Sequence, residues 1–115
     1  MAVLCAGGAV QDIVMRVATF PKAGHKVQAS EYVVTIGGQS GNAAMAAARL
    51  GALTFYAGTL GAPDDPVAGE IVAALEKHGV DCSGKVRVPG ASSSVSLIML
   101  DAQGEKMIAT RRDSG

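Results

Sequence analysis

The stretch TIGGQSGNAAMAAARLGA, residues 35–52, joins an apolar strand to a helix and decides how the chain is read. Its glycines, Gly37, Gly38 and Gly41, permit positive φ angles and a close approach of the backbone to another group. They lead into an alanine-rich segment of strong helix formers. The start of a helix carries free N–H groups that attract oxygen-rich or anionic ligands. The small residues therefore indicate either a ligand-binding turn or only tight seating of the helix on a sheet, and their spacing alone does not separate these two interpretations.

The turn differs from the two common phosphate-binding loops. No Lys-Ser/Thr pair follows at the offset of a Walker A motif. The spacing Gly-Gly-x-x-Gly is also not the Gly-x-Gly-x-x-Gly of a dinucleotide-binding fold. A dinucleotide site needs an acidic residue about 20 positions further on to hold the ribose, and this chain has Phe55-Tyr56-Ala57-Gly58 in that region. The sequence therefore argues against a dinucleotide site.

Composition limits the class of partner. The 115 residues suffice for one domain, and 49% of them are apolar, which is enough for a hydrophobic core. Aromatic residues make up only 3%, and the 10 Lys and Arg residues balance the 10 Asp and Glu residues. The chain thus lacks the stacking faces and the basic excess that are typical of nucleic-acid binders. These features favour a small-molecule partner and no nucleic acid.

Cysteine usage and hydropathy predict a cytoplasmic protein. Cys5 lies in an apolar run and is expected to be a buried, inert thiol, whereas Cys82 is expected in a loop. Their spacing fits neither a metal site nor a disulfide framework. The N-terminus has no features of a secretory leader, and no segment offers the roughly 18 consecutive apolar residues of a membrane helix. His25 and His78 are isolated and are expected at the surface or at a helix end, with no metal role.

The order of predicted elements is that of an α/β domain with an added β layer. Strands are expected at residues 3–7, 13–17, 27–36, 53–57, 85–88, 95–100 and 106–110, and helices at residues 42–50 and 66–78. Asp65 is expected to cap the second helix, with Pro66 at its first position. Two helices cannot cover both faces of a doubly wound sheet with this many strands. The chain is therefore expected either to pair with another chain or to be the front part of a longer one.

The glycine turn and its surroundings also carry a resemblance to a known family. Residues 37–44, GGQSGNAA, followed by AARLGA at 47–52, resemble the first signature of the ribokinase-like (PfkB-type) sugar kinases. Other segments match in order and spacing. Residues 7–12 resemble the family's first strand and its substrate aspartate, and residues 20–24 the turn within its lid. Residues 58–61 with 64–65 resemble the strand and turn before its second helix, and residues 92–94 and 101–105 the returning lid strands. The resemblance covers the whole chain.

The resemblance implies a fold and an assembly. The fold is a Rossmann-like partial sheet with helices and a small β-sheet lid, formed by residues of about 13–36 and 85–112. Residues 1–115 would be the N-terminal part of a sugar kinase domain. In this family the lid often forms a dimer interface, so the resemblance also implies a homodimer through the lid strands. ATP and Mg²⁺ would be bound by a nucleotide-binding C-terminal part that these residues do not include.

The resemblance further implies which residues bind the substrate. Asp12 is expected to accept hydrogen bonds from two sugar hydroxyls. Gly37 and Gly38 are expected to let backbone N–H groups approach the sugar, and Asn42 to bond another hydroxyl. From the residues alone, Asp12 is interpreted as a turn residue whose side chain caps free backbone N–H groups after the first strand.

Several positions remain open between two interpretations. Gln39 stands where ribose-directed members often have lysine, and Val10 replaces a sugar-binding asparagine, which together argue against ribose itself. The run Ser92-Ser93-Ser94, with Ser93 as the candidate site residue, belongs either to a polar edge-strand face or to the substrate site. Arg112, with Arg111 beside it, is either a solvated charge at a strand end or the partner of an acidic substituent on the substrate.

No catalytic residue is expected within the chain. The family's second signature, Asp-Thr-x-Gly-Ala-Gly-Asp, supplies a general base and a turn that stabilises the transferred phosphoryl group. The segment Asp113-Ser114-Gly115 is the most similar part of the sequence, but it does not match that motif. The sequence therefore predicts the sugar-binding part of an ATP-dependent carbohydrate kinase that phosphorylates a sugar or sugar-acid hydroxyl, with these residues alone inactive. The alternatives are a non-catalytic sugar-binding or dimerisation module and a nucleoside kinase of the same fold. Which sugar and which hydroxyl do not follow from the sequence.

Overall fold

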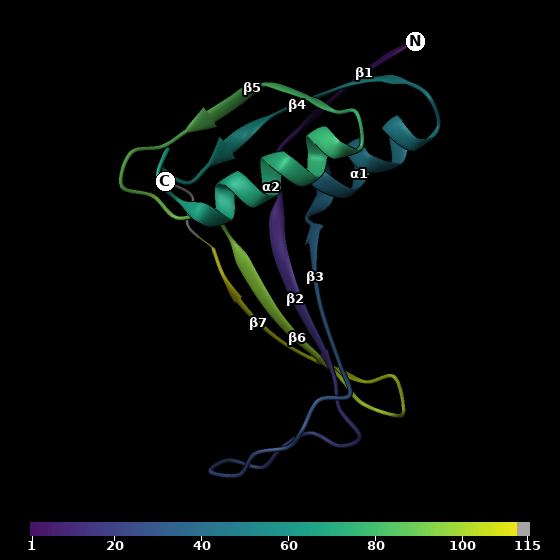
Figure 1. The fold of residues 1–115 in the computed structure, drawn as a ribbon, viewed down its shortest axis with the longest axis vertical. Coiled ribbons are helices and arrows are strands. Elements are labelled where there is room, and N and C mark those ends of the chain that lie inside the picture. The colour runs from purple at the N-terminus through teal and green to yellow at the C-terminus, as the bar shows by residue number, and fades with distance from the viewer. Residues whose placement is uncertain (113–115) are drawn as a thin grey trace.

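A computed structural model describes residues 1–112 as two β-sheets and two helices (Figure 1). The elements follow in the order β1 (Ala2–Ala6), β2 (Val10–Arg16), β3 (Glu31–Gly37), α1 (Gln39–Arg49), β4 (Leu53–Leu60), α2 (Pro66–Lys77), β5 (Asp81–Arg87), β6 (Val95–Leu100) and β7 (Lys106–Arg111). The predicted α/β domain with an added β layer is confirmed. Neither helix in this part of the chain is long and apolar enough to cross a membrane. Asp113, Ser114 and Gly115, the text closest to the second signature, lie outside the described residues.

Strands β1, β4 and β5 form a parallel sheet in the order β1-β4-β5, which we call the core sheet. Helices α1 and α2 pack on one of its faces (Figure 1). Tyr56, Ile71 and Leu75 are fully buried between the sheet and the helices, and burial of a large apolar side chain stabilises a fold by roughly 1.5–3 kcal/mol. Successive strand residues point to opposite faces, so Leu4 and Leu53 lie on the other face, where both are exposed.

The two helices begin for different local reasons. Asp65 caps α2 as predicted, because its side chain accepts a hydrogen bond from the Val67 amide at 3.2 Å, with a proline at the first helical position. Helix α1 begins at Gln39, three residues before the predicted start at Asn42. The amides of Ser40 and Gly41 both donate to the Gly8 carbonyl oxygen, which lies outside the helix. In an isolated polar, glycine-containing turn these amides would be left to solvent. That support extends the helix toward its N-terminus.

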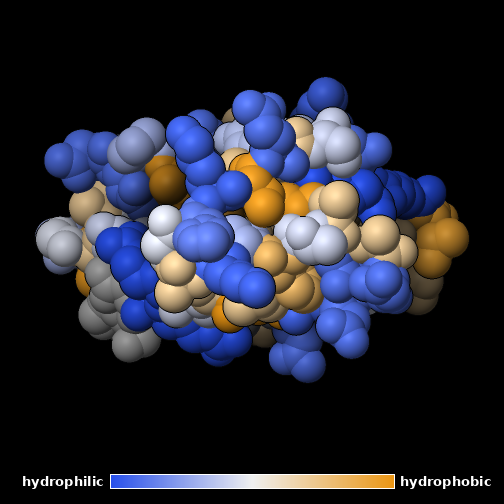
Figure 2. Space-filling model, turned by 90° about the horizontal axis from the view of Figure 1, so that it is seen from below, coloured by the Kyte–Doolittle hydropathy of each residue, from blue (hydrophilic) through white to orange (hydrophobic). Residues whose placement is uncertain are grey.

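The second sheet, which we call the lid, has the strand order β3-β2-β6-β7. Strand β2 pairs antiparallel with β3 and parallel with β6, and β6 pairs antiparallel with β7. The lid projects away from the helices (Figure 1). Its strands expose several large apolar residues: Tyr32, Val33, Val34, Leu97, Met107 and Ile108. Viewed from the lid end of the molecule, apolar surface lies among hydrophilic side chains (Figure 2).

The predicted start of the second half of the lid, at about residue 85, is wrong. Residues 85–87 belong to β5, which pairs parallel with β4 in the core sheet, and the second half of the lid begins at Val95. Cys82, expected in a loop, is buried in β5. The Ser83-Gly84 pair gives this segment the local appearance of a turn. Gly84 is instead a point of close contact, where an added Cβ would lie 3.1 Å from the Ala57 side chain.

The first half of the lid also differs from its predicted bounds. Strand β2 begins at Val10 rather than at residue 13, so the lid starts directly after the core strand β1. Strand β3 begins at Glu31, and the expected extension back to residue 27 is a loop. Arg16 and Glu31 form an ion pair of 3.2 Å where β2 ends and β3 begins. The alternation of residues 27–31 reflected exposed loop positions, not a half-buried strand.

Candidate functional site

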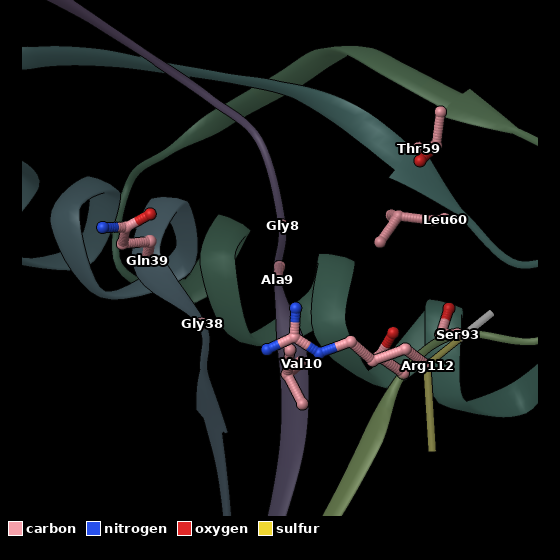
Figure 3. A pocket seen from close by; sticks show the side chains of 10 residues that line it. Gly8, Ala9, Val10, Gly38, Gln39, Thr59, Leu60, Ser93 and Arg112 are labelled. Carbon is pink, nitrogen blue, oxygen red and sulfur yellow. The ribbon is translucent and has the colours of Figure 1, made fainter. Parts of the chain in front are cut away.

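A cavity of about 410 Å³ opens where the core sheet meets the lid, at the carboxyl ends of β1 and β4 (Figure 3). It is lined by Gly8, Ala9, Val10, Gly38, Gln39, Thr59, Leu60, Ser93, Ser94 and Arg112. Its volume is in the range of small-molecule sites. In open sheets with parallel strands, ligands bind beyond the carboxyl ends of the strands. The fold therefore presents this cavity as the candidate site.

The connection from β1 to β2 forms one wall of the cavity and is fixed by hydrogen bonds from two other elements. The hydroxyl of the fully buried Tyr56 donates to the Gly7 carbonyl oxygen at 2.9 Å. The hydroxyl of Ser40 donates to the Ala6 carbonyl oxygen at 2.7 Å. Both bonds hold carbonyl groups that would otherwise need water. The wall is therefore held in place without a ligand.

The start of α1 forms the opposite wall and packs directly on that connection. The amides of Ser40 and Gly41 donate to the Gly8 carbonyl oxygen at 3.1 and 3.3 Å. Gly38 has φ 82° and ψ 158°, a conformation that is essentially restricted to glycine, and an added Cβ would lie 2.8 Å from the Gly8 oxygen. Two helical amides are thus already used. Of Gly37 and Gly38, whose backbone amides were expected to approach a ligand, only Gly38 lines the cavity, and Gln39 lines it beside Gly38.

Asp12 and Gly37 are direct neighbours beside the cavity. They lie on the paired strands β2 and β3, and the Asp12 carboxylate fills the space that a side chain at Gly37 would need. Burial raises the pKa of Asp12. Within residues 1–112, no hydrogen bond to this carboxylate offsets its burial. Val10, two positions earlier on the same strand face, lines the cavity. A half-buried carboxylate without a partner is a candidate ligand-binding group.

Ser93 is almost fully buried and is held by two backbone-to-side-chain hydrogen bonds. Its amide donates to Asp65 Oδ2 at 2.8 Å, and its hydroxyl accepts from the Gly61 amide at 2.9 Å. Burial alone raises the pKa of Asp65, but hydrogen bonds from Ser93, Val67 and Ala68 outweigh it, so that the pKa lies below its usual value. The sequence did not predict the hydrogen bond between Ser93 and Asp65. Only the helix cap formed by Asp65 has a local sequence signal.

The adjacent arginines at the end of the chain point to different places. The Arg111 guanidinium donates to the Ser93 carbonyl oxygen at 3.2 Å. The Arg112 side chain extends from the end of β7 into the cavity, toward the side formed by Ala9 and Val10 (Figure 3). Arg112 lines the cavity and is also exposed, so its position fits both readings, a contact with a ligand and a solvated charge at a strand end.

The predicted site residues fall into three groups. Gly38, Gln39, Ser93 and Arg112 line the cavity. Gly37 and Asp12 lie next to it, whereas Asn42 is exposed on the first turn of α1 and is not part of the lining. Thr59 and Leu60 line the cavity but were not predicted, and Ser94, from the serine run in which a substrate contact was left open, lines it too. The position of the first two at the carboxyl end of a buried parallel strand is the signal that could have found them.

The described residues do not by themselves fit a magnesium site. Among residues 1–112, no group of three or more His, Cys, Asp or Glu side chains is placed to hold a metal ion. Mg²⁺ in phosphoryl-transfer enzymes is bound through carboxylates and the phosphates of the nucleotide. We therefore derive no step through ATP or Mg²⁺ from these residues.

Comparison with known proteins agrees with the fold. The chain is 34% identical to the ribokinase of Bacillus subtilis (strain 168) over 102 residues, which are 89% of this chain and 34% of that protein. It superposes on the crystal structure of a provisionally named ribokinase from Agrobacterium tumefaciens with a TM-score of 0.89 and 38% identity, covering 97% of this chain and 36% of that one.

A third comparison is with Arabidopsis thaliana ribokinase, whose structure is described as a complex with ribose and ATP. The TM-score is 0.81 and the identity 27%, over 98% of this chain and 36% of that one. The chain thus spans about a third of the length of these relatives. Residues 2–114 match the model of the pfkB family of carbohydrate kinases, and the chain belongs to that family.

Proposed function

We propose that residues 1–115 form the sugar-binding part of an ATP-dependent carbohydrate kinase that transfers the γ-phosphate of ATP to a hydroxyl of a sugar or sugar acid. The observation that carries this proposal is the cavity at the carboxyl ends of β1 and β4 with the unpartnered carboxylate of Asp12 beside it. The family match and the ribose and ATP in the Arabidopsis thaliana relative support it.

In this proposal the residues around the cavity hold the sugar and orient its reacting hydroxyl. Asp12 accepts hydrogen bonds from sugar hydroxyls, and the missing side chain of Gly37 leaves room for its carboxylate. Gly38 and Gln39 offer backbone amides at the start of α1, where the helix dipole favours oxygen ligands. Asn42 lies on the same helical turn and takes part only if the ligand extends beyond the cavity.

Phosphoryl transfer depends mainly on positioning and on stabilising the charge of the transferred group. The described residues account for the positioning of one reactant, the sugar. The second family signature, with its general base, does not occur in the sequence. We therefore propose that residues 1–115 alone bind sugar but do not turn over ATP.

The exposed apolar surface of the lid supports a further part of the proposal, a homodimer. Tyr32 and Val33 on β3 are 62% and 50% exposed, and Ile108 on β7 is 58% exposed. Val33 pairs with Val14, Val14 with Ile98 and Ile98 with Ile108, so these four apolar side chains share one face of the lid, and Tyr32 lies on the other face. Contiguous apolar surface such as this row is typical of protein–protein contacts. Sedimentation of the complete protein should give a dimer that Val33→Glu converts to a monomer, and a monomeric wild-type protein would contradict the dimer.

The proposed activity is tested with the complete protein that contains these residues. Sugars, sugar acids and nucleosides are screened for ATP-dependent ADP release, and binding is measured in parallel by calorimetry. We expect sugar-dependent turnover that is lost in Asp12→Ala and retained in Arg16→Gln, a variant far from the cavity at the end of β2. Sugar binding without turnover would favour the non-catalytic module, and turnover with nucleosides alone would make the protein a nucleoside kinase.

A further inference from the structure

We propose that the cavity takes a sugar that carries an acidic group and that Arg112 binds this group. The inference rests on the proposed function and narrows its substrate class. Of the 10 residues that line the cavity, Arg112 is the one with a charged side chain. The cavity therefore holds a positive charge and, among the residues that line it, no carboxylate to neutralise that charge.

Arg112 differs from the other arginines of the chain in having no acceptor within residues 1–112. The others all have one: Arg16 the Glu31 carboxylate, Arg49 the His78 ring, Arg87 the carbonyl oxygens of Gly61, Ala62 and Pro63, and Arg111 the carbonyl oxygen of Ser93. Arginine carries donors in a fixed fork and remains charged at all ordinary pH values. A guanidinium that enters a cavity without an acceptor is suited to an acidic ligand.

Within residues 1–112, the one ion pair joins Arg16 to Glu31, so neither Asp65 nor Asp12 is paired with Arg112. Asp65 is occupied, because its two oxygens accept hydrogen bonds from the Val67 and Ser93 amides. Asp12 lies outside the lining and against Gly37, on the β2–β3 side. No carboxylate of residues 1–112 therefore neutralises the Arg112 guanidinium, which can bind an anionic group of a ligand.

The surroundings of the guanidinium increase the strength of such a contact. Ala9, Val10 and Leu60 supply apolar surface to the same cavity. Arg112 itself is exposed, but a ligand in the cavity would cover its guanidinium against these walls, where water screens an ion pair less than on an open surface. A planar carboxylate matches the guanidinium fork with two parallel hydrogen bonds. Ser94 and Thr59, which also line the cavity, offer hydroxyl groups to the sugar itself.

Asp12 and Arg112 would then recognise opposite features of one ligand. Asp12, as an acceptor, selects hydroxyl groups, whereas Arg112, as a donor with a positive charge, selects the acid. A neutral sugar could satisfy Asp12 but would leave Arg112 without its partner. Specificity is the difference between the two binding free energies, and a charged hydrogen bond contributes about 1.5–3 kcal/mol to such a difference. This corresponds to a preference of about 10- to 100-fold for the acidic sugar.

The test uses the complete protein and a panel of matched ligands. Each set contains a neutral sugar, the acid in which one primary alcohol is oxidised to a carboxylate, and the phosphate ester of that alcohol. Binding constants are measured by calorimetry, and kcat/KM is measured by ADP release. Arg112→Gln removes the charge, Arg112→Lys keeps the charge without the fork, and Arg16→Gln is the control with the same loss of charge outside the cavity.

We expect the wild-type protein and Arg16→Gln to prefer an acidic sugar by about 10- to 100-fold. Arg112→Gln should bring the ratio of acidic to neutral sugar close to one, and Arg112→Lys should keep part of it. A greater preference for the carboxylate than for the phosphate ester would identify the acid as a carboxylate, and the reverse order would identify it as a phosphate. Both orders support an acidic substrate.

Two results would overturn the inference, and they are distinguishable. If a neutral sugar is the better substrate and Arg112→Gln leaves the ratio unchanged, Arg112 does not read an acid, while the kinase proposal stands. If neither neutral nor acidic sugars bind or support ADP release, the proposed function falls and the inference falls with it.

Discussion

One carboxylate oxygen of Asp65 accepts a hydrogen bond from the Ser93 amide at 2.8 Å, and this bond ties the start of α2 to the wall of the cavity. The other oxygen caps the helix through the Val67 amide. Ser93 in turn accepts a bond from the Gly61 amide and holds the Arg111 guanidinium with its carbonyl oxygen. Asp65 is therefore a positioning residue for the segment that separates the core sheet from the lid.

Replacing Asp65 by alanine should destabilise the protein by about 2–4 kcal/mol. A lost helix cap costs about 1 kcal/mol, and the buried Ser93 amide left without an acceptor costs a further 1–3 kcal/mol. Asp64→Ala is the matched control, because Asp64 is exposed and is expected to change the stability by less than about 0.5 kcal/mol. Urea denaturation measures both variants, and equal effects at the two positions would contradict the role of Asp65.

The contribution of Asp65 should depend on pH. Hydrogen bonds hold the pKa of Asp65 below its usual value despite the opposing effect of burial. A carboxyl group with a lowered pKa stabilises the fold above its unfolded pKa of about 4, and this stabilisation is lost as the pH falls through the folded value. Asp65→Asn should therefore be less stable than wild type at pH 7, with a difference that shrinks below about pH 4. Denaturation midpoints between these pH values provide the measurement, and a constant difference would count against the prediction.

Asp12 should show the opposite balance of stability and function. Burial raises its pKa, so the charged form is disfavoured in the folded protein and its effect is unfavourable above the folded pKa. Asp12→Asn should leave the stability at pH 7 unchanged or slightly higher. Sugar affinity should fall by at least about 10-fold, because one of the two acceptor oxygens becomes an NH2 donor and the negative charge is lost. Thermal denaturation and calorimetry separate the two effects. A clear loss of stability with normal sugar binding would assign Asp12 a structural role.

The adjacent glycines of the turn should respond differently to the same substitution. Gly38→Ala forces a side chain into a backbone conformation restricted to glycine and against the Gly8 carbonyl oxygen, at a cost of about 1–3 kcal/mol in stability. Gly37→Ala meets only the flexible end of the Asp12 side chain, so it should displace the carboxylate and weaken sugar binding more than it lowers stability. Denaturation and binding measured on both variants check this. An equal ratio of lost stability to lost sugar affinity in the two variants would contradict this prediction.

Local signals in the sequence were enough for some elements of this fold. The Asp65-Pro66 pair predicts the start of α2, because a cap and a first-turn proline act within a few residues. The strand before Gly37 and the buried state of Cys5 were likewise predicted from neighbouring residues. The glycine turn identified the start of α1 to within one helical turn, although α1 has no side-chain cap at its first residue.

Other features depend on which strands pair, and the sequence carries no local signal for that. The assignment of residues 85–88 to the lid was wrong because a short strand looks the same in either sheet. The bond between Asp65 and Ser93 joins segments that meet only in the folded chain. The directions of Arg111 and Arg112 follow from strand alternation, but which of them enters the cavity depends on the pairing of β7 with β6.

The parallel pairing of β2 with β6 has a consequence for how the protein folds. Gln11 pairs with Val95, so the centre of the lid joins two strands that β3, both helices and the core strands β4 and β5 separate along the chain. Closing such a long loop costs conformational entropy before the contacts between the two strands form. Topologies rich in pairings between distant segments therefore fold slowly. The β2–β3 and β6–β7 pairs can each form early from neighbouring segments, but their union must wait for the core. The cavity between core and lid is therefore one of the last parts of this chain to assemble.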